Sequence, residues 1–321
     1  MDKKQLLLKI FRIAALVLVI AAVAVAVASY MFMANLEKKM KLPPKEVKAV
    51  GKVIKKPTDN APFYVLLVGT DRRPDWSVSR ADTIMVLRVD TESKRMHLLS
   101  IPRDSRVAIE GHGLDKINHS FAFGGAPLLI KTVEDFTGLP INYYFQVDFQ
   151  GFSEMVDAVG GIYFNVDSSW INGKNQTVSS GSNVWVDKLS GSKVRFGNLK
   201  RDGKEILGLL RVRSYPDGDF TRIKHQQQFI REVMKQTLNS YTDIPRLASI
   251  GASYTRTNMD IAKIIALGKN FTDPQLDLQM ATVPGKTGML KGVSYVFPDN
   301  SAKDELVRQM KEGQNFSQGP K

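Results

Sequence analysis

The sequence of 321 residues contains no cysteine and only four histidines. Without cysteine the chain cannot form disulfides, thiolate nucleophiles or cysteine-based metal sites. The histidines show no spacing typical of metal ligands, and the sequence contains neither a G-x-S-x-G nucleophile motif nor a phosphate-binding loop of the Walker type. These absences exclude thiol, zinc-finger and serine-hydrolase chemistry and argue against a requirement for ATP.

Acidic residues are fewer than basic ones, which gives a formal net charge of +13. Residues 1–60 carry 12 basic and 4 acidic side chains, so +8 of this excess lies at the N-terminal end and +5 on residues 61–321. A nucleic-acid-binding domain needs its positive charge on the folded part, and no helix-turn-helix pattern is present. The charge distribution therefore predicts no nucleic-acid partner.

Only one long hydrophobic run is present, Ile13–Met33, with 21 residues and no charge. As a helix it would span about 30 Å, the hydrocarbon thickness of a bilayer. We expect a transmembrane helix at 13–33 behind a short cytoplasmic tail at 1–12, whose basic residues favour a cytoplasmic N-terminus. Small residues at Ala24, Ala26 and Ala28 leave a cleaved signal peptide as the alternative.

Two segments lack the periodicity of regular structure. Residues 34–60 are polar, rich in lysine and interrupted by prolines, and we expect them to form a stalk. The lysines of this stalk are interpreted as a solvated spacer or, alternatively, as a surface resting on anionic lipid head groups. Residues 167–203 are rich in serine, glycine and asparagine, which favours an irregular insertion or a hairpin beside the main sheet.

The rest of residues 61–321 alternates short apolar runs with amphipathic segments. Strands are predicted at 63–69, 83–89, 96–100, 142–147, 162–166, 278–283 and 295–298. Helices are predicted at 127–137, 151–159, 204–210, 219–239, 260–270 and 301–311. A capping box from Thr257 to Asp260 is expected to begin the helix at 260–270. Strands that alternate with helices predict a layered α/β domain with a mixed sheet.

Charged residues gather at the ends of predicted strands, where functional sites usually lie. The clusters are Gly69–Arg73, Arg80–Thr83, Ile101–Asp104 and the charged stretches between Leu210 and Gln227. Arginine binds phosphate through parallel charge-assisted hydrogen bonds. Carboxylates without histidine or cysteine suit Mg²⁺, which combines one or two carboxylates with phosphate oxygens. The combination favours a metal-bound pyrophosphate, although a structural ion pair is the alternative for any single pair, and a helix cap for Asp219.

In their order along the chain, these segments resemble the motifs of the LytR-CpsA-Psr family. The matching motifs are V-G-T-D at 68–71, R-A-D-T-I-M at 80–85, S-I-P-R-D at 100–104, K-I-N at 116–118, the G-G helix at 124–135, Y-Y-F-Q-V-D-F-Q-G-F at 143–152, D-A-V-G-G-I at 157–162, R-V-R at 211–213, D-F-T-R at 219–222 and Q-Q at 226–227. The resemblance is close over 62–240 and looser beyond. Two departures are the segment 167–203 and His225, which replaces an arginine of many relatives and so removes a positive charge or makes it pH-dependent.

The resemblance implies a three-layer α/β/α fold with a central mixed sheet and a hydrophobic lipid cavity, preceded by one transmembrane helix. The catalytic domain, 61–321, would lie outside the cell in a Gram-positive envelope. Asp71 and Asp82 would bind Mg²⁺, with Mn²⁺ as the alternative ion. The residues implied to bind pyrophosphate are Arg80, Arg103, Arg211, Arg213, Arg222 and Gln226, and those implied in catalysis are Arg103, Arg213 and Asp219. Asp219 would orient arginines or act on the incoming hydroxyl.

The implied activity is transfer of a phosphate-linked glycopolymer from a polyprenyl pyrophosphate carrier to a peptidoglycan hydroxyl, with release of polyprenyl phosphate. The polymer would be teichoic acid, capsule or another wall polymer, and the membrane would hold donor and enzyme in one plane. Two alternatives use the same residues: hydrolysis of polyprenyl pyrophosphates by water, and a non-enzymatic lipid-binding protein that regulates envelope assembly. The sequence does not distinguish these alternatives.

Overall fold

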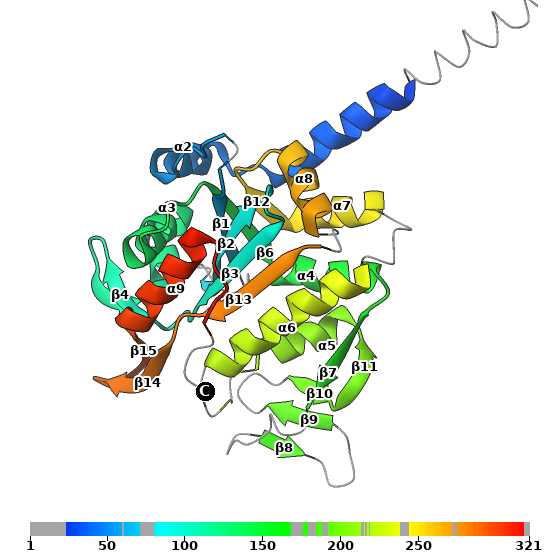
Figure 1. The fold of residues 1–321 in the computed structure, drawn as a ribbon. Helices are drawn as coiled ribbons and strands as arrows, with labels where there is room; N and C mark the ends of the chain where they lie inside the picture. Colours follow the sequence, from blue (N-terminus) through cyan, green and yellow to red (C-terminus); the bar gives the residue numbers. More distant parts are fainter. Residues whose placement is uncertain are drawn as a thin grey trace, which may run out of the picture.

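The computed structural model describes residues 24–59, 61–70, 80–167, 176–178, 184–187, 192–212, 215, 217, 219–237, 244–271 and 275–317. Its central element is a six-stranded sheet with the order β12-β6-β1-β2-β3-β13 (Figure 1). These strands are β1 Phe63–Thr70, β2 Ala81–Asp90, β3 Arg95–Ile101, β6 Tyr143–Asp148, β12 Thr255–Thr257 and β13 Asp277–Thr282. All but β12 correspond to strands expected from the apolar runs of the sequence.

Four strands of the sheet run in the same direction. β1 pairs in parallel with β6 and antiparallel with β2, while β3 pairs antiparallel with β2 and in parallel with β13. Thr70 pairs with Asp148 on one side and with Ala81, the first residue of β2, on the other. Ser100 near the end of β3 pairs with Thr282 at the end of β13. The ends of β1, β3, β6 and β13 and the beginning of β2 therefore meet at one edge, here called the carboxyl edge.

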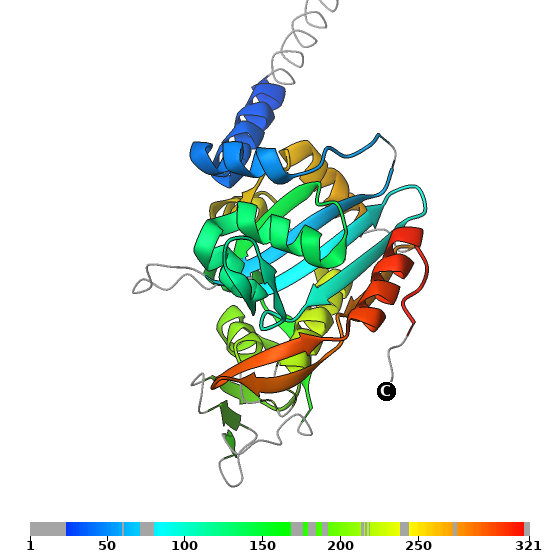
Figure 2. The same ribbon diagram turned by 90° about the vertical axis from the view of Figure 1, so that its left-hand side faces the viewer.

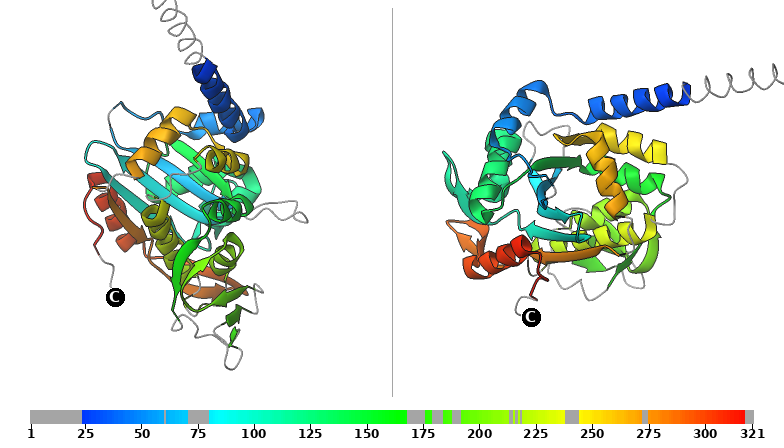
Figure 3. Two further views of the ribbon diagram at one scale, coloured as in Figure 1. Left: turned by 90° about the vertical axis from the view of Figure 1, so that its right-hand side faces the viewer. Right: turned by 45° about the horizontal axis from the view of Figure 1, so that its top comes forward.

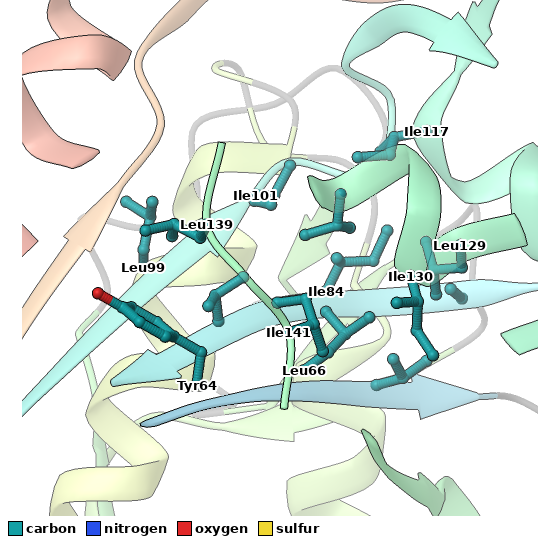
Figure 4. Close-up of a cluster of buried hydrophobic side chains, with 14 of the residues drawn as sticks. Tyr64, Leu66, Ile84, Leu99, Ile101, Ile117, Leu129, Ile130, Leu139 and Ile141 are labelled. Atoms are coloured by element: carbon teal, nitrogen blue, oxygen red, sulfur yellow. The ribbon is translucent and has the colours of Figure 1, made fainter. Parts of the chain in front are cut away.

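One face of the sheet is covered by α2 (Pro44–Val53), α3 (Ile117–Thr137) and α9 (Asn300–Glu312) (Figure 2). The side chains of Leu66 and Ile84 from the strands and of Leu129 from α3 belong to one fully buried core (Figure 4). Burying one such side chain contributes about 1.5–3 kcal/mol. This core therefore supplies a large part of the stability of the domain.

The opposite face is covered by α4 (Phe149–Ala158), α6 (Asp219–Thr237), α7 (Ile244–Tyr254) and α8 (Ile261–Phe271) (Figure 3). Many apolar side chains between the sheet and these helices are only partly buried. They are Leu67, Tyr143, Phe145, Ile230, Ile264, Leu267, Leu276, Leu278 and Met280. The sheet lies between two helical layers, so the prediction of a mixed α/β fold is confirmed, and the two layers differ in how tightly they pack.

A second, smaller core lies next to α4 and α6 (Figure 1). It is built from α5 (Gly203–Leu210), the pair β7 (Ile162–Val166) and β11 (Gly197–Arg201), and a three-stranded sheet. The three strands are β8 Gln176–Val178, β9 Val184–Asp187 and β10 Lys193–Arg195. Trp185 of β9 is fully buried. Of the two alternatives predicted for 167–203, the described parts agree with the hairpin and not with an irregular insertion. β8, β9 and β10 pair antiparallel in a sheet separate from the main one, and their apolar residues are buried against α5.

The segment expected to be a stalk is largely helical and packs on the domain. Residues 24–40 form one helix, and α2 begins after Pro43, where the following proline suits a first helical turn. Leu36 and Met40 pack with Ala252 of α7, and Val50 belongs to the main core. The expectation of a polar spacer at 34–60 is therefore corrected over these helices. The lysines of the segment are exposed, and they outnumber the few apolar residues that pack on the domain, so the sequence pattern looked polar throughout.

The described part of the chain contains no helix that has both the length and the hydropathy of a membrane span. Of the apolar run at 13–33, residues 13–23 lie outside the described residues, as does the tail at 1–12. Residues 24–33 belong to the helix at 24–40, in which Val25, Tyr30 and Met31 are exposed.

The helix expected at 127–137 is the second half of α3. Gly124 and Gly125 have non-helical backbone angles, and Gly125 has a φ of 63°, a conformation that favours glycine. The first half, which begins at Ile117, was not predicted. It points the beginning of α3 toward the carboxyl edge, where the N–H of Ile117 donates to the carbonyl of Ser105 at 2.8 Å.

One further prediction is confirmed in part and another is wrong. The strand predicted at 295–298 is present as β15 (Val293–Pro298), but it pairs with β14 (Gly285–Leu290) in a separate hairpin and not with the main sheet. The capping box is also displaced, because Asp260 and not Thr257 caps α8 by accepting from the N–H of Lys263 at 2.8 Å. Thr257 still belongs to β12 and accepts from the N–H of Met259.

Candidate active site

The carboxyl edge brings together three of the predicted site residues. Arg80 directly precedes β2, Asp82 is the second residue of that strand, and Arg103 follows β3 by two residues. They line a cavity of about 210 Å³, whose lining is completed by Asp104, Lys116, Asn118 and His119. Residues 23 positions apart in the sequence thus share one small polar cavity because β2 and β3 are antiparallel neighbours.

Arg103 is the centre of an ion-pair cluster. Its Nη1 donates to Asp82 Oδ1, and its Nε lies 3.6 Å from Asp219 Oδ1 and 3.7 Å from Asp104 Oδ2. Its backbone N–H donates to Asp219 Oδ2 at 3.2 Å. Burial alone lowers the pKa of the Arg103 guanidinium, but the carboxylates of Asp219, Asp82 and Asp104 raise it above its ordinary value. Arg103 therefore carries a fixed positive charge.

Asp219 and Arg222 extend this cluster from the first turn of α6. Arg222 Nη2 donates to Asp219 Oδ1 at 2.7 Å and to the carbonyl of Asp82 at 2.8 Å. Both carboxylate oxygens of Asp219 are thus engaged, and only 5% of its side chain is exposed. An acidic residue also suits the partial positive charge at the beginning of a helix. Asp219 therefore joins α6 to the loop after β3 and aligns two arginines.

Gln227 fixes α6 over the same edge of the sheet. Its Nε2 donates to Ser100 Oγ at 2.9 Å, to the carbonyl of Ala281 at 3.0 Å and to Thr282 Oγ1 at 3.2 Å. The sequence pattern had assigned a role to Gln226 alone. Successive helical residues point about 100° apart, so when Gln227 contacts the sheet, its neighbour Gln226 projects in a different direction.

Three buried nitrogen donors in this region have no hydrogen-bond acceptor among the described residues. They are Arg103 Nε, Arg222 Nε and Gln226 Nε2. An unsatisfied buried donor costs about 1–3 kcal/mol and is rare in folded proteins. Arg222 and Gln226 are four residues apart on α6 and share one face, and burial lowers the pKa of the Arg222 guanidinium. Of these three residues, Arg103 lines the cavity, and anionic oxygens are the acceptors that such donors bind most strongly.

The remaining predicted residues are placed as follows. Asp71 and Arg213 lie outside the described residues. The Arg211 guanidinium lies 6.0 Å from the centre of the Phe149 ring, at the beginning of α4. That ring packs closely on the end of β1, since a Cβ added to Gly69 would come within 2.8 Å of Phe149 Cε1. Arg211 is therefore located at the carboxyl edge, beside the ring and on the α4 side of the site.

A divalent cation fits this site only with help from a ligand. The described residues contain no group of three or more acidic or histidine side chains that could hold a metal ion. Within the described chain, Asp82 uses Oδ1 to pair with Arg103 and makes no further hydrogen bond or ion pair through Oδ2. Mg²⁺ accepts such a sparse set, one or two carboxylates completed by phosphate oxygens and water.

His225 belongs to the smaller core and not to the arginine cluster. Only 2% of the residue is exposed, and its Nδ1 forms a hydrogen bond of 2.9 Å with the hydroxyl of Tyr215. Burial lowers the pKa of the imidazole to about 3. The histidine that replaces the arginine of many relatives is thus neutral at physiological pH, which excludes a pH-dependent charge there.

The burial of His225 predicts a loss of stability in acid. The ordinary pKa of histidine is 6.5, whereas the folded pKa is about 3, so between these values the unfolded chain binds more protons. The free energy of unfolding should therefore fall with decreasing pH, by at most about 1.4 kcal/mol per pH unit from this residue. The free energy of unfolding can be measured with urea at neutral pH and at about pH 4.5. Its decrease between the two pH values should be smaller for His225→Gln than for the wild type and for the control Tyr215→Phe. Equal decreases in all three would contradict the prediction.

The sequence analysis missed two residues at the cavity, Asp115 and His119, whose side chains meet with His119 Nδ1 2.8 Å from Asp115 Oδ2. This pair had a detectable signal, because an aspartate and a histidine four residues apart bracket the K-I-N motif. Asp104 and Lys116 belong to motifs that the sequence singled out, but their ion pair at 2.8 Å was not predictable. The two residues come from segments joined by the β4–β5 hairpin (Arg106–Ile109 and Gly113–Lys116).

The structure is thus an α/β domain with a mixed sheet, in which arginines and carboxylates line a cavity at the carboxyl edge. The model of the LytR_cpsA_psr family matches residues 25–312. The chain belongs to this family, and the match includes the helices at 24–40 and 44–53 that pack on the domain.

Known relatives include a teichoic acid transferase and a regulatory protein. The chain is 31% identical over 255 residues to the polyisoprenyl-teichoic acid–peptidoglycan teichoic acid transferase TagU of Bacillus subtilis strain 168, covering 78% of each chain. It is 35% identical over 199 residues to the regulatory protein MsrR of Staphylococcus aureus strain COL, covering 61% of this chain and 56% of that one. The solved structure of B. subtilis TagV is 26% identical, with a TM-score of 0.62, and covers 81% of this chain and 100% of that chain.

Proposed function

We propose that this chain transfers a phosphate-linked glycopolymer of the teichoic acid type from a polyprenyl pyrophosphate carrier to a hydroxyl of peptidoglycan, releasing polyprenyl phosphate. The observation that carries the proposal is the group of buried donors on Arg103, Arg222 and Gln226, which lack acceptors among the described residues. The substrate class is supported by membership of the family and by the relative TagU, which is named as a teichoic acid transferase acting on peptidoglycan.

In such a reaction the arginines would supply most of the catalytic effect. Phosphoryl transfer depends chiefly on positioning and on neutralising the charge of the transferred group. Arg103 and Arg222 would bind oxygens of the pyrophosphate, with Arg80 and Gln226 beside them and Arg211 at the α4 side. By its motif, Arg213 would also bind the pyrophosphate. Asp219 would position the two central arginines, because both of its oxygens are already engaged.

The metal and the lipid complete the proposal. Asp82 and Asp71 would hold Mg²⁺ or Mn²⁺, which, when bound, neutralises part of the charge of the pyrophosphate. The polyprenyl chain would lie between the sheet and α6 and α8, where the apolar side chains are only partly buried. An N-terminal membrane anchor at 13–33 would keep the enzyme in the plane of its lipid donor.

The test uses the full-length chain in detergent, a synthetic polyprenyl pyrophosphate saccharide, Mg²⁺ and peptidoglycan fragments, followed by mass spectrometry. We expect saccharide phosphate attached to the glycan together with polyprenyl monophosphate, and loss of both products with EDTA. Lipid phosphate with free saccharide phosphate would instead indicate a hydrolase. Intact donor that stays bound to the protein would contradict an enzymatic function for these substrates.

A further inference from the structure

His119 and Asp115 form a hydrogen-bonded pair on the wall of the active-site cavity. Asp115 lies in β5 and His119 in the first turn of α3, and His119 Nδ1 is 2.8 Å from Asp115 Oδ2. Within the described residues, His119 Nε2 makes no hydrogen bond or ion pair. Because His119 lines the same cavity as Arg103 and Arg80, this free nitrogen belongs to the site that would bind the pyrophosphate.

The carboxylate of Asp115 is fixed and ionised. Its Oδ1 accepts from the N–H of Lys116 at 2.7 Å and lies 3.5 Å from the hydroxyl of Tyr295. Partial burial alone raises the pKa of Asp115, but the hydrogen bonds from His119 and from the Lys116 N–H lower it below its ordinary value. An ionised carboxylate accepts the proton on Nδ1, which leaves the lone pair of the imidazole on Nε2.

The surroundings of His119 keep its ring in place without occupying Nε2. The ring of Phe123, one turn along α3, packs edge-on against the imidazole with ring centres 5.9 Å apart. The nearest cation on β5, Lys116, is directed to Asp104 at 2.8 Å. The other charged groups of the cavity are Arg80, Asp82 and Arg103. The imidazole is thus fixed by Asp115 and Phe123 in a cavity that contains both signs of charge.

The other acidic groups of the cavity are engaged elsewhere. Asp219 uses both oxygens for Arg103 and Arg222. Asp104 pairs with Lys116 and lies near Arg103, and Asp82 pairs with Arg103 through one oxygen. Among the described residues that line the cavity, His119 is therefore the group that combines a free lone pair with a partner suited to stabilising its protonated form.

We propose that His119 is the general base of the transfer reaction and that Asp115 positions it, an inference that rests on the proposed function. The hydroxyl of the acceptor sugar gives its proton to His119 Nε2, and its oxygen forms a bond to the sugar-proximal phosphorus. The bond from that phosphorus to the bridging oxygen breaks. The bridging oxygen leaves with the electron pair as polyprenyl phosphate, and the imidazolium returns its proton to solvent.

The test compares the full-length wild type with His119→Gln and Asp115→Asn, using the same donor, Mg²⁺ and acceptor. General bases typically contribute about 10²- to 10⁴-fold, so His119→Gln should lower kcat by that order while donor affinity, measured with a fluorescent donor analogue, stays unchanged. The pH profile of kcat should differ between His119→Gln and the wild type. Asp115→Asn should lower kcat less and should also change the profile. The control Arg308→Ala, at an exposed position of α9 where the arginine pairs with Glu305 and Glu312, should behave as the wild type.

Chemical rescue separates a base from a structural residue. Transfer by His119→Ala should be restored in part by added imidazole, whereas a merely structural role would give no rescue. Wild-type kcat with an unchanged pH dependence in His119→Gln would overturn the proposal, and so would reduced turnover that imidazole does not raise while donor affinity is intact. Absence of turnover in the wild type itself, with donor bound, would instead overturn the proposed function.

Discussion

Replacing Arg103 by alanine is expected to lower the rate of glycopolymer transfer by about 10²-fold or more. The guanidinium contacts the carboxylates of Asp82 and Asp219, lies near Asp104, and has a buried Nε without an acceptor among the described residues. Its removal takes away a fixed positive charge at the point where negative charge develops on the transferred phosphoryl group. The measurement is kcat and KM in the purified transfer reaction.

Two variants make the result interpretable. Arg103→Lys keeps the charge but loses the planar pair of donors that matches phosphate, so it should retain only part of the activity. Arg308→Ala removes an exposed arginine of α9 that pairs with Glu305 and Glu312 and should leave transfer unchanged. Near-normal turnover in Arg103→Ala, with the chain folded by circular dichroism, would show that the site has been assigned to the wrong residues.

The sheet was predictable because most of its strands are short apolar runs, whose length and bounding polar turns are typical of buried strands. The proximity of Arg80, Asp82 and Arg103 was also predictable from their positions at strand ends. The end of β3 lies beside the beginning of its antiparallel neighbour β2, so these residues meet at one edge of the sheet. These are local signals, and they identified the strands of the main sheet apart from β12, whose three residues are too few to show a pattern.

The contacts that determine what each residue does are not local. The bond from the Arg103 N–H to Asp219 joins positions 116 residues apart, and Gln227 binds Ser100 across 127 residues. No sequence pattern distinguishes Gln227, which binds the sheet, from Gln226, whose Nε2 lacks an acceptor in the described chain. The prediction of a polar spacer at 34–60 failed for a related reason. A helix can pack on the domain through only a few apolar residues, such as Leu36 and Val50, and so few residues do not form a recognisable pattern.

Asp219→Asn is expected to reduce both the stability of the protein and the rate of transfer. The carboxylate lies between Arg103 and Arg222, with its side chain 5% exposed, and removing one partner of a buried ion pair typically costs about 3–5 kcal/mol. The repulsion between the two guanidinium groups is then compensated only by Asp82 and Asp104, and the arginines lose the carboxylate that aligns them. Urea unfolding and the kinetics of transfer should both detect the change, with kcat lowered by about 10²-fold.

A bound anion should compensate for the lost carboxylate, because it supplies negative charge between the same two arginines. Inorganic pyrophosphate with Mg²⁺ should therefore raise the melting temperature of Asp219→Asn more than that of the wild type. Asp217→Asn is the matched control: Asp217 accepts from the N–H and hydroxyl of Thr221 at 3.2 and 2.8 Å, so its loss should cost about 1 kcal/mol without altering transfer. If Asp219→Asn had the same free energy of unfolding as the wild type and an unchanged kcat, the positioning role of Asp219 would be contradicted.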